Sequence, residues 1–467
     1  MCFLGGKMKV KLFLLSFIFI FLSCDLFIQK GEDFIGKPEM IEIEIAEQTV
    51  IDERKWTLFI YMCADNNLES SAIEDMYEME CSNLNTDETT VVILLDRSPL
   101  YNSSNNNWTE TKMYKLKSGA KENPKKILSE EIECKELGLI KDLDVELDMS
   151  DENTLSSAMQ YVFSKYPASN LGLIMWGHGS GWKNDESENL NNYKGFAFDE
   201  SSSSYMSLPK FGIALEKGLE GKKLDFLGFD TCYGAELEVL YELKDYVKYA
   251  CGSEGLISTD GWNYTKLFNS FQISEKKNAN DLLDACLLQF SETYTNSSRA
   301  SFCVCDVSKI DSYFKTFDNF MALCGHNIVN SNIRDSVFEK IYASNDCNTE
   351  RYTYGKDGYD IYLDCYSLCE NLTQYFCSQI ITEAFHNFLQ AENECVLNSW
   401  ASDRDRGGIG VYFQTLSTGG LIQTFYNSNY IKGKAYDQSK FVMDSNGYVP
   451  NINLSESFLD KLFYTKY

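Results

Sequence analysis

Histidine, proline and positive charge are scarce in this sequence. Its 467 residues include 3 His and 6 Pro, and 42 Lys and Arg stand against 69 Asp and Glu, which gives a net charge of -27. A negative field of this size repels phosphate backbones and anionic lipid headgroups, so we expect no nucleic-acid partner, whereas cationic ligands would be attracted. With 44% hydrophobic residues, the composition is typical of a folded globular protein and not of a disordered chain.

A dense disulfide or metal framework is also missing. The 16 cysteines show no regular short spacing, so their pairing cannot be read from the sequence, and we expect some of them to be buried thiols. The pairs Cys303 with Cys305 and Cys365 with Cys369 have no histidine nearby at the spacing of a zinc site. We therefore predict no metal ligands.

The apolar run near the amino terminus is too short to cross a bilayer, yet it has the organisation of an export signal. Lys7, Lys9 and Lys11 precede an apolar stretch over 12–22, which falls short of the about 20 residues of a membrane span. Cys24 directly follows a serine, and this arrangement resembles a bacterial lipobox, in which the cysteine is lipidated. We expect an exported protein held on a bacterial cell membrane, at its periplasmic or extracellular face, through Cys24 alone. A signal that is cleaved without lipidation is the alternative.

Short apolar runs alternate with helical periods over the first half of the chain. The strand patterns fall at 57–62, 91–95, 171–176 and 224–229, with helical patterns at 68–79, 151–164 and 208–220. Continuous apolar runs are typical of strands that are covered on both faces. They predict an α/β fold in which helices flank a mostly parallel sheet.

Beyond residue 276 the pattern becomes mainly helical. The helical stretches fall at 280–293, 306–327 and 366–388, and a late strand that joins the sheet is expected at 408–413 because its residues are β-branched and aromatic. We divide the chain into a lipoprotein-type signal at 1–24, a tether at 25–55, an α/β core at 56–275, a helical region with the late strand at 276–413, and a tail of unassigned role at 414–467.

Two of the predicted strands run into residues that can carry out chemistry. One leads into His178, which has glycine on both sides, and the other leads into Asp230 and Cys232. Parallel strands place their carboxyl ends at one edge of a sheet, so His178 and Cys232 could meet there. An imidazole can take the proton of a thiol and deliver it to a leaving amine, while the backbone N–H groups of Gly179 and Cys232 could stabilise an oxyanion. The sequence therefore predicts a nucleophile paired with a general acid and base.

The segments around these residues resemble the signature blocks of the clostripain family of cysteine peptidases. The likeness is carried by Leu-Ile-Met-Trp-Gly-His-Gly-Ser-Gly-Trp at 173–182 and Leu-Gly-Phe-Asp-Thr-Cys at 227–232, with further similarity at 61–68, 261–264, 362–364 and 408–413. The resemblance implies a caspase-like α/β fold with its catalytic core at 56–275. It also implies a dyad of His178 and Cys232 that cleaves protein or peptide substrates after Arg or Lys.

The same resemblance implies a basis for specificity. Asp230 matches the acidic residue two positions before the nucleophile, which lies in the S1 pocket and binds the basic P1 side chain before the scissile bond. Asp260 would be a second acidic wall of that pocket. A simple cap at the strand end is the alternative role for Asp230.

Self-processing and calcium are two further properties of family members. Some relatives cut themselves between the two blocks, where this chain offers Lys183, Lys194, Lys210 and Lys217. Calcium dependence occurs in part of the family, but no Asp-rich loop of the EF-hand type is found here, so no motif supports a cofactor and calcium stays an open alternative.

Two other functions stay open beside the cysteine endopeptidase. One is a surface-anchored binding protein without turnover, and the joint presence of His178, Cys232 and Asp230 argues against it because a scaffold has no chemical need for all three. The other is a thiol transpeptidase that uses the same covalent intermediate. Product analysis with an added amine would separate transfer from hydrolysis.

Overall fold

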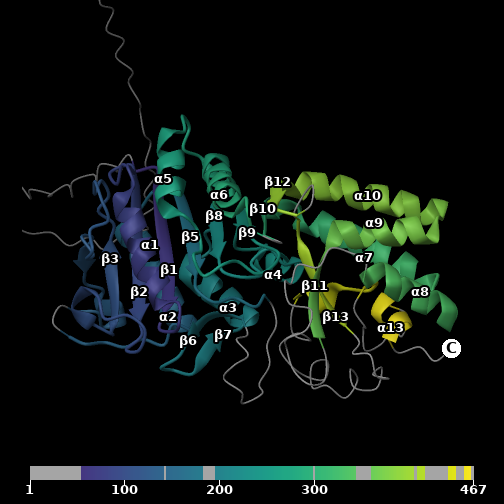
Figure 1. Cartoon of the computed structure of the whole chain (residues 1–467), viewed down its shortest axis with the longest axis horizontal. Coiled ribbons are helices and arrows are strands. Elements are labelled where there is room, and N and C mark those ends of the chain that lie inside the picture. Colours follow the sequence, from purple (N-terminus) through teal and green to yellow (C-terminus); the bar gives the residue numbers. More distant parts are fainter. Residues whose placement is uncertain are drawn as a thin grey trace, which may run out of the picture. The chain divides into compact units, whose positions relative to one another are not determined.

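The computed structural model describes residues 54–140, 143–181, 195–297, 300–342, 359–403, 408–415, 440–448 and 457–463, which belong to one compact unit spanning 51–467 (Figure 1). The predicted signal, Cys24 and all of the tether except residues 54 and 55 lie outside this part of the chain, and their assignments stay predictions. Among the helices that are described, none combines the length and the apolar character that crossing a bilayer requires.

A nine-stranded sheet organises the fold, in the order β12-β10-β9-β8-β5-β1-β2-β3-β4. In chain order its strands are β1 (Trp56–Ala64), β2 (Thr89–Arg97), β3 (Thr111–Lys115), β4 (Glu130–Ile132), β5 (Asn170–Trp176), β8 (Phe226–Asp230), β9 (Tyr249–Gly252), β10 (Ser301–Asp306) and β12 (Val396–Ala401). The central strands from β9 to β2 run parallel, and the strands outside them on both sides are antiparallel to their neighbours. This arrangement confirms the predicted α/β sheet.

Alternate residues of the central strands enter two separate hydrophobic cores, because successive side chains of a strand point to opposite faces of the sheet. In β1, Phe59 and Tyr61 belong to one core, and Leu58 and Ile60 to the other. All residues of β1 are buried, which explains why its sequence is a continuous apolar run.

Helices cover both faces of the sheet (Figure 1). The first core is closed by α2 (Glu152–Lys165), α3 (Leu208–Leu219) and α4 (Leu237–Leu243). The second core is closed by α1 (Glu69–Cys81), α5 (Tyr264–Ile273) and α6 (Ala279–Tyr294). The carboxyl ends of the parallel strands are therefore the place where polar residues of the central sheet can reach solvent.

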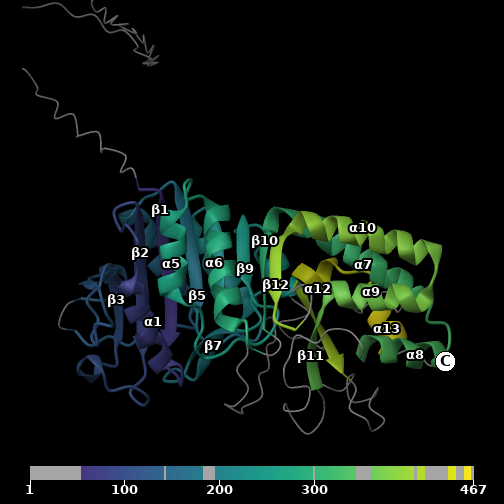
Figure 2. The ribbon, with the colours of Figure 1, turned by 45° about the horizontal axis from the view of Figure 1, so that its top comes forward.

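The remaining helices form a group beside the sheet (Figure 2). They are α7 (Ile310–His326), α8 (Ser331–Tyr342), α9 (Cys365–Phe376), α10 (Gln379–Cys395), α12 (Lys440–Asp444) and α13 (Phe458–Phe463). The single helix predicted at 366–388 is instead the pair α9 and α10, because Cys377 adopts a left-handed backbone (φ 48°) that ends the first helix. The short α12 and α13 pack on α4 and α7, respectively, so part of the predicted tail belongs to the compact unit.

The expected position of residues 408–413 is wrong. β13 (Gly410–Thr415) pairs antiparallel with β11 (Tyr359–Asp364) in a separate two-stranded sheet, and β6 (Phe196–Asp199) with β7 (Ser204–Met206) forms another. The late strand of the main sheet is β12, which lies at an edge and is only partly buried. Its sequence therefore lacks the apolar run that marks the central strands.

Candidate active site

The site is built where two adjacent parallel strands end. β5 and β8 pair in register up to Trp176 and Asp230, and His178 and Cys232 each follow their strand by two residues. The amide of Gly177 still donates to the carbonyl oxygen of Asp230, with an N···O distance of 3.3 Å. The two residues therefore leave neighbouring strands at the same edge and in the same register.

Gly179 makes a close approach between the two strand ends. A Cβ atom at this position would lie 2.4 Å from the carbonyl oxygen of Cys232 and 2.8 Å from Oγ1 of Thr231. Only glycine fits such a contact. The backbones of Gly179 and Cys232 consequently run against each other, as they must if their N–H groups are to serve one oxyanion.

Left-handed backbone conformations flank both candidate residues. Gly177 precedes His178 with a φ of 133°, and Tyr233 follows Cys232 with a φ of 57°. A non-glycine residue in this region costs about 1–3 kcal/mol and persists only where its surroundings hold it. Tyr233 is held by the bond from its amide to the carbonyl of Gly255 (2.9 Å) and by ring packing on Tyr362, with centroids 4.5 Å apart. The turn after Cys232 is thus fixed from both sides.

His178 is a partly buried side chain held by Asn67. Its Nε2 atom lies 2.7 Å from Oδ1 of Asn67, and the ring meets the edge of Phe198 with centroids 6.4 Å apart. Because an amide oxygen carries no hydrogen, Nε2 of His178 is the donor, and Nδ1 is the basic nitrogen of the neutral ring. Burial lowers the pKa of His178 to about 4, so the imidazole is uncharged near neutral pH.

Cys232 is a partly exposed free thiol whose sulfur accepts a bond from the backbone. The amide of Ile257 lies 3.4 Å from its Sγ atom. Burial raises the pKa of Cys232 to about 11; the Ile257 amide opposes this shift, and the charge of Asp230 adds to it. In the substrate-free protein both the thiol and the imidazole are therefore neutral.

Asp230 lies beneath the strand ends as a buried carboxyl. Its oxygens accept bonds from the amide of Trp262 (3.1 Å) and from the hydroxyl of Tyr264 (3.0 Å). Burial raises the pKa of Asp230 to about 7 although both bonds lower it. Asp75 is a second buried carboxyl, held by Nε1 of Trp176 at 2.7 Å, and its pKa is raised well above the ordinary value by burial and then by the charge of Asp230. The negative charge that Asp230 or Asp75 carries when ionised is thus poorly compensated at these buried positions.

Asp260 occupies a different setting from Asp230. It is exposed, in a loop where Oγ of Ser258 lies 3.4 Å from its carboxylate. Tyr294 lies near both acids: its hydroxyl donates to the carbonyl of Gly261 (2.6 Å), and its pKa is raised by burial and then by the charges of Asp230 and Asp260. The structure therefore brings both predicted acids to the same region, one buried and one at the surface.

Three contributors were not predicted from sequence. Asn67 lies in the segment at 61–68 that resembles the family, but nothing local indicates that it contacts His178. Tyr362 donates from its hydroxyl to the carbonyl of Ser180 (2.7 Å) while packing on Tyr233, and Asp75 comes from α1. Each reaches the site only through the tertiary fold, so no sequence spacing reveals it.

A thiol and an imidazole that follow adjacent parallel strands, above a buried acid in a helix-flanked sheet, define the class of cysteine peptidases with a caspase-like fold. The sequence model of the clostripain family matches residues 60–443. The chain belongs to the clostripain family, and it is a cysteine-type peptidase.

Similar proteins cover nearly the whole chain. Clostripain from Hathewaya histolytica is 24% identical over 475 residues, which are 87% of this chain and 88% of that protein. An inactive protease zymogen from Parabacteroides distasonis has a TM-score of 0.58 at 17% identity and covers 84% of this chain and 98% of its own. A secreted cysteine protease from Bacteroides thetaiotaomicron, in complex with an irreversible peptide inhibitor, has a TM-score of 0.56 at 17% identity and covers 81% and 97%. These solved structures share the fold.

Proposed function

We propose that this chain is an endopeptidase that cleaves after Lys or Arg, with Cys232 as the nucleophile and His178 as the general acid and base. The observation that carries the proposal is the register of β5 and β8, which brings both residues to one edge of the sheet with Gly179 packed against the backbone of Cys232. Because the thiol of Cys232 and the imidazole of His178 are both neutral, we expect the thiol proton to move to the imidazole as the sulfur attacks. A thiolate–imidazolium pair formed before substrate binds is the alternative that this neutral state disfavours.

The reaction begins when Sγ of Cys232 attacks the scissile carbonyl carbon while Nδ1 of His178 takes the thiol proton. The negative charge on the carbonyl oxygen is stabilised by the N–H groups of Gly179 and Cys232. The imidazolium then gives its proton to the departing amine, and a thioester is left on Cys232. Water hydrolyses this thioester with His178 as base, which restores the thiol. Asn67 holds the ring in the tautomer that these steps require.

Basic specificity rests on the buried acid Asp230. Asp230 carries three hydrogen-bond contacts and still has a pKa of about 7, so the charged carboxylate is costly to bury without a cation. A Lys or Arg side chain at P1 would supply that missing positive charge. Asp260 would draw the cation in from solvent.

Self-processing, if it accompanies this activity, has two favoured positions. Lys210 and Lys217 lie in α3, where the backbone N–H groups are bonded within the helix and the chain cannot extend into an active site. Lys183 and Lys194 lie outside the described residues. We infer that cleavage follows Lys183 or Lys194. Amino-terminal sequencing of the matured protein would then find Asn184 or Gly195, and a new terminus after Lys210 or Lys217 would contradict this inference.

The membrane anchor is a separate part of the proposal. Cys24 would be lipidated after export, which metabolic labelling with a fatty-acid analogue tests directly. The Cys24→Ala variant should lose the label and leave the membrane fraction. Labelling that persists in this variant would contradict the role of Cys24.

A lysyl chloromethyl ketone tests the peptidase proposal. The reagent should alkylate Cys232 and leave Cys377 unlabelled, although Cys377 is the more exposed of these two thiols, because Cys377 does not follow β8 beside the proposed P1 site. The His178→Ala variant should react much more slowly. A peptide library should then be cut after Lys or Arg by the parent and not by Cys232→Ala. Equal labelling of both thiols, or cleavage after acidic residues, would overturn the proposal.

A further inference from the structure

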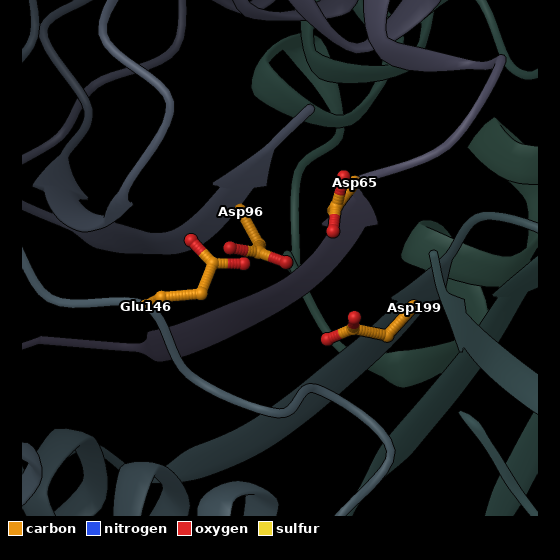
Figure 3. Close-up of side chains that lie close together, drawn as sticks. All are labelled: Asp65, Asp96, Glu146 and Asp199. Carbon is orange, nitrogen blue, oxygen red and sulfur yellow. The ribbon is translucent and has the colours of Figure 1, made fainter. Parts of the chain in front are cut away.

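We propose that Asp65, Asp96, Glu146 and Asp199 form a binding site for a divalent cation, with calcium as its preferred ion. Each offers one carboxylate oxygen, and these oxygens all lie within 4.8 Å of one another. Figure 3 shows the four side chains converging from separate segments: the turn after β1, the end of β2, the loop before α2 and the end of β6. The proposal does not depend on the peptidase mechanism.

Unsatisfied buried oxygens point to a ligand at this cluster. Asp65 is 1% exposed and Asp96 is 0% exposed, and Oδ1 of Asp65 and Oδ2 of Asp96 have no hydrogen-bond partner. The other oxygen of each is held: Oδ2 of Asp65 accepts from the amide of Ser201 (2.8 Å), and Oδ1 of Asp96 accepts from Oγ1 of Thr111 (2.7 Å). A buried polar atom without a partner is costly. A cation would satisfy both atoms at once.

The surrounding backbone fixes the other two carboxylates. Asp199 accepts from the amides of Met149 (2.9 Å) and Ser202 (2.7 Å) through its two oxygens. Thr111 ties down the loop of Glu146 from both sides: its amide donates to the carbonyl of Val145 (2.8 Å), and its Oγ1 accepts from the amide of Leu147 (3.0 Å). Glu146 is exposed, so it offers an ion a path from solvent. The cluster is thus a preorganised site with one open side.

The ligand chemistry distinguishes between ions. Four carboxylates at this spacing repel one another, and a divalent cation removes much of that repulsion. Oxygen ligands suit Ca²⁺ and Mg²⁺, whereas Zn²⁺ and Cu²⁺ favour imidazole and thiolate. Mg²⁺ demands a near-ideal octahedron, keeps several waters and is usually held by one or two carboxylates, while Ca²⁺ accepts six to eight oxygens in flexible geometry. Four converging carboxylates therefore favour Ca²⁺.

The site would brace the turn after β1. The carbonyl of Asp65 accepts from the amide of Glu200 (2.9 Å), and Nδ2 of Asn66 donates to the carbonyl of Phe198 (2.9 Å), so this turn and the end of β6 are already joined. An ion between Asp65 and Asp199 would add a further link between the same two segments, beside these bonds and the one from the amide of Ser201 to Asp65. Asn67, the contact of His178, is the next residue along this turn.

Calorimetric titration of CaCl₂ into the full chain tests the proposal. The chain carries Cys232→Ala to prevent self-cleavage and is first stripped with a chelator. We expect saturable binding at one site and a higher Tm with calcium, because an ion that binds only the folded state stabilises it. Glu146→Gln should weaken binding at least about tenfold, the loss that follows even from removing an outer partner of a metal ligand. Glu146 is exposed, so this variant is expected to fold.

Asp144→Asn is the matched control. Asp144 lies exposed in the same loop and the substitution removes the same charge, but it is not one of the four converging carboxylates. Its calcium affinity should match that of the parent. Equal affinities of Glu146→Gln and Asp144→Asn would overturn the proposal, as would an absence of heat and of Tm shift in the parent at millimolar calcium. Tighter binding of MgCl₂ than of CaCl₂ would overturn the choice of ion.

Discussion

His178 donates from Nε2 to Oδ1 of Asn67 across 2.7 Å, and this contact joins the end of β5 to the turn after β1. The bond determines which ring nitrogen carries the proton of the neutral imidazole and therefore which one can act as a base. Asn67 itself is exposed. It contributes to the site through this bond and does not need to touch substrate.

Replacement of Asn67 by alanine should impair the proposed base without unfolding the protein. We expect Asn67→Ala to lower kcat about 10- to 100-fold with little change in KM, by analogy with the loss of the partner that orients a metal-bound histidine. Asn67→Asp should restore an acceptor and also raise the pKa of His178 through its negative charge, so the acidic limb of the pH–rate profile moves to higher pH. Steady-state kinetics across pH 4–9 would measure both effects.

Asn83→Ala provides the comparison for this pair of variants. Asn83 is also exposed and follows α1, but it has no contact with His178. Its kcat and pH profile should equal those of the parent. The positioning role of Asn67 would be wrong if Asn67→Ala kept the parent rate and Asn67→Asp kept the parent profile.

The neutral resting state predicts how Cys232 reacts with a small alkylating reagent. Because the pKa of Cys232 is about 11, its rate of reaction with iodoacetamide should rise about tenfold for each pH unit between pH 6 and pH 10. A thiolate–imidazolium pair would instead give a plateau across neutral pH. Mass spectrometry of the peptide that carries Cys232 measures the rate. The exposed thiol of Cys377 serves as an internal reference, because its labelling shows that active reagent is present in the same sample. A constant rate from pH 6 to pH 8 would contradict the neutral pair.

The sequence predicted those parts of the site that follow directly from strand pattern. β5 and β8 are buried apolar runs, so their ends, and with them His178 and Cys232, could be placed from the sequence alone. Asn67 and Tyr362 could not, because each contact depends on how distant segments pack. β12 could not be predicted for a different reason, because it lies at an edge of the sheet and its sequence has no apolar run.

The acidic cluster is the clearest case of what the sequence did not reveal. Asp65 resembles a turn residue, Asp96 and Asp199 end apolar runs, and Glu146 lies in a polar loop. No spacing among them matches a metal-binding loop. The parallel pairing of β1 with β2, the placement of β6 beside β1, and the bonds of Thr111 to the loop of Glu146 bring the four carboxylates together.

Replacement of Asp230 by asparagine should remove the preference for basic substrates. A buried carboxylate that pairs with the P1 cation is worth several kcal/mol, so Asp230→Asn should lower kcat/KM for Lys and Arg at P1 by about 100-fold or more relative to a neutral P1 residue. In the parent, kcat/KM for basic substrates should rise with pH through about 7, because Asp230 is then charged. That dependence should be absent in the variant.

Asp260→Asn is the control for the buried acid. Asp260 is exposed and solvent screens its charge, so its loss should cost less than about tenfold. Iodoacetamide labelling of Cys232 in both variants would verify that the site is still formed. A larger effect from Asp260→Asn than from Asp230→Asn would reverse the roles proposed for the two acids.

Glu238, a buried carboxyl in α4, should make the folded protein less stable as the pH rises from 4.5 to about 8. Burial raises its pKa to about 8 from an ordinary value of 4.5, so between these values the folded state holds a proton that the unfolded state has released. The stabilisation is fully present below pH 4.5 and is lost as the pH rises through 8, with a slope of up to about 1.4 kcal/mol per pH unit.

Glu238→Gln keeps the acceptor for the amide of Tyr412 (3.1 Å) and removes the ionisable group. The difference in free energy of unfolding between the variant and the parent should therefore grow in favour of the variant by up to about 4 kcal/mol from pH 5 to pH 8, as measured by Tm in the Cys232→Ala background. Glu216→Gln, an exposed change of the same type in α3, should follow the parent at every pH, and a Glu238→Gln curve parallel to the parent would show that this carboxyl does not titrate differently in the folded state.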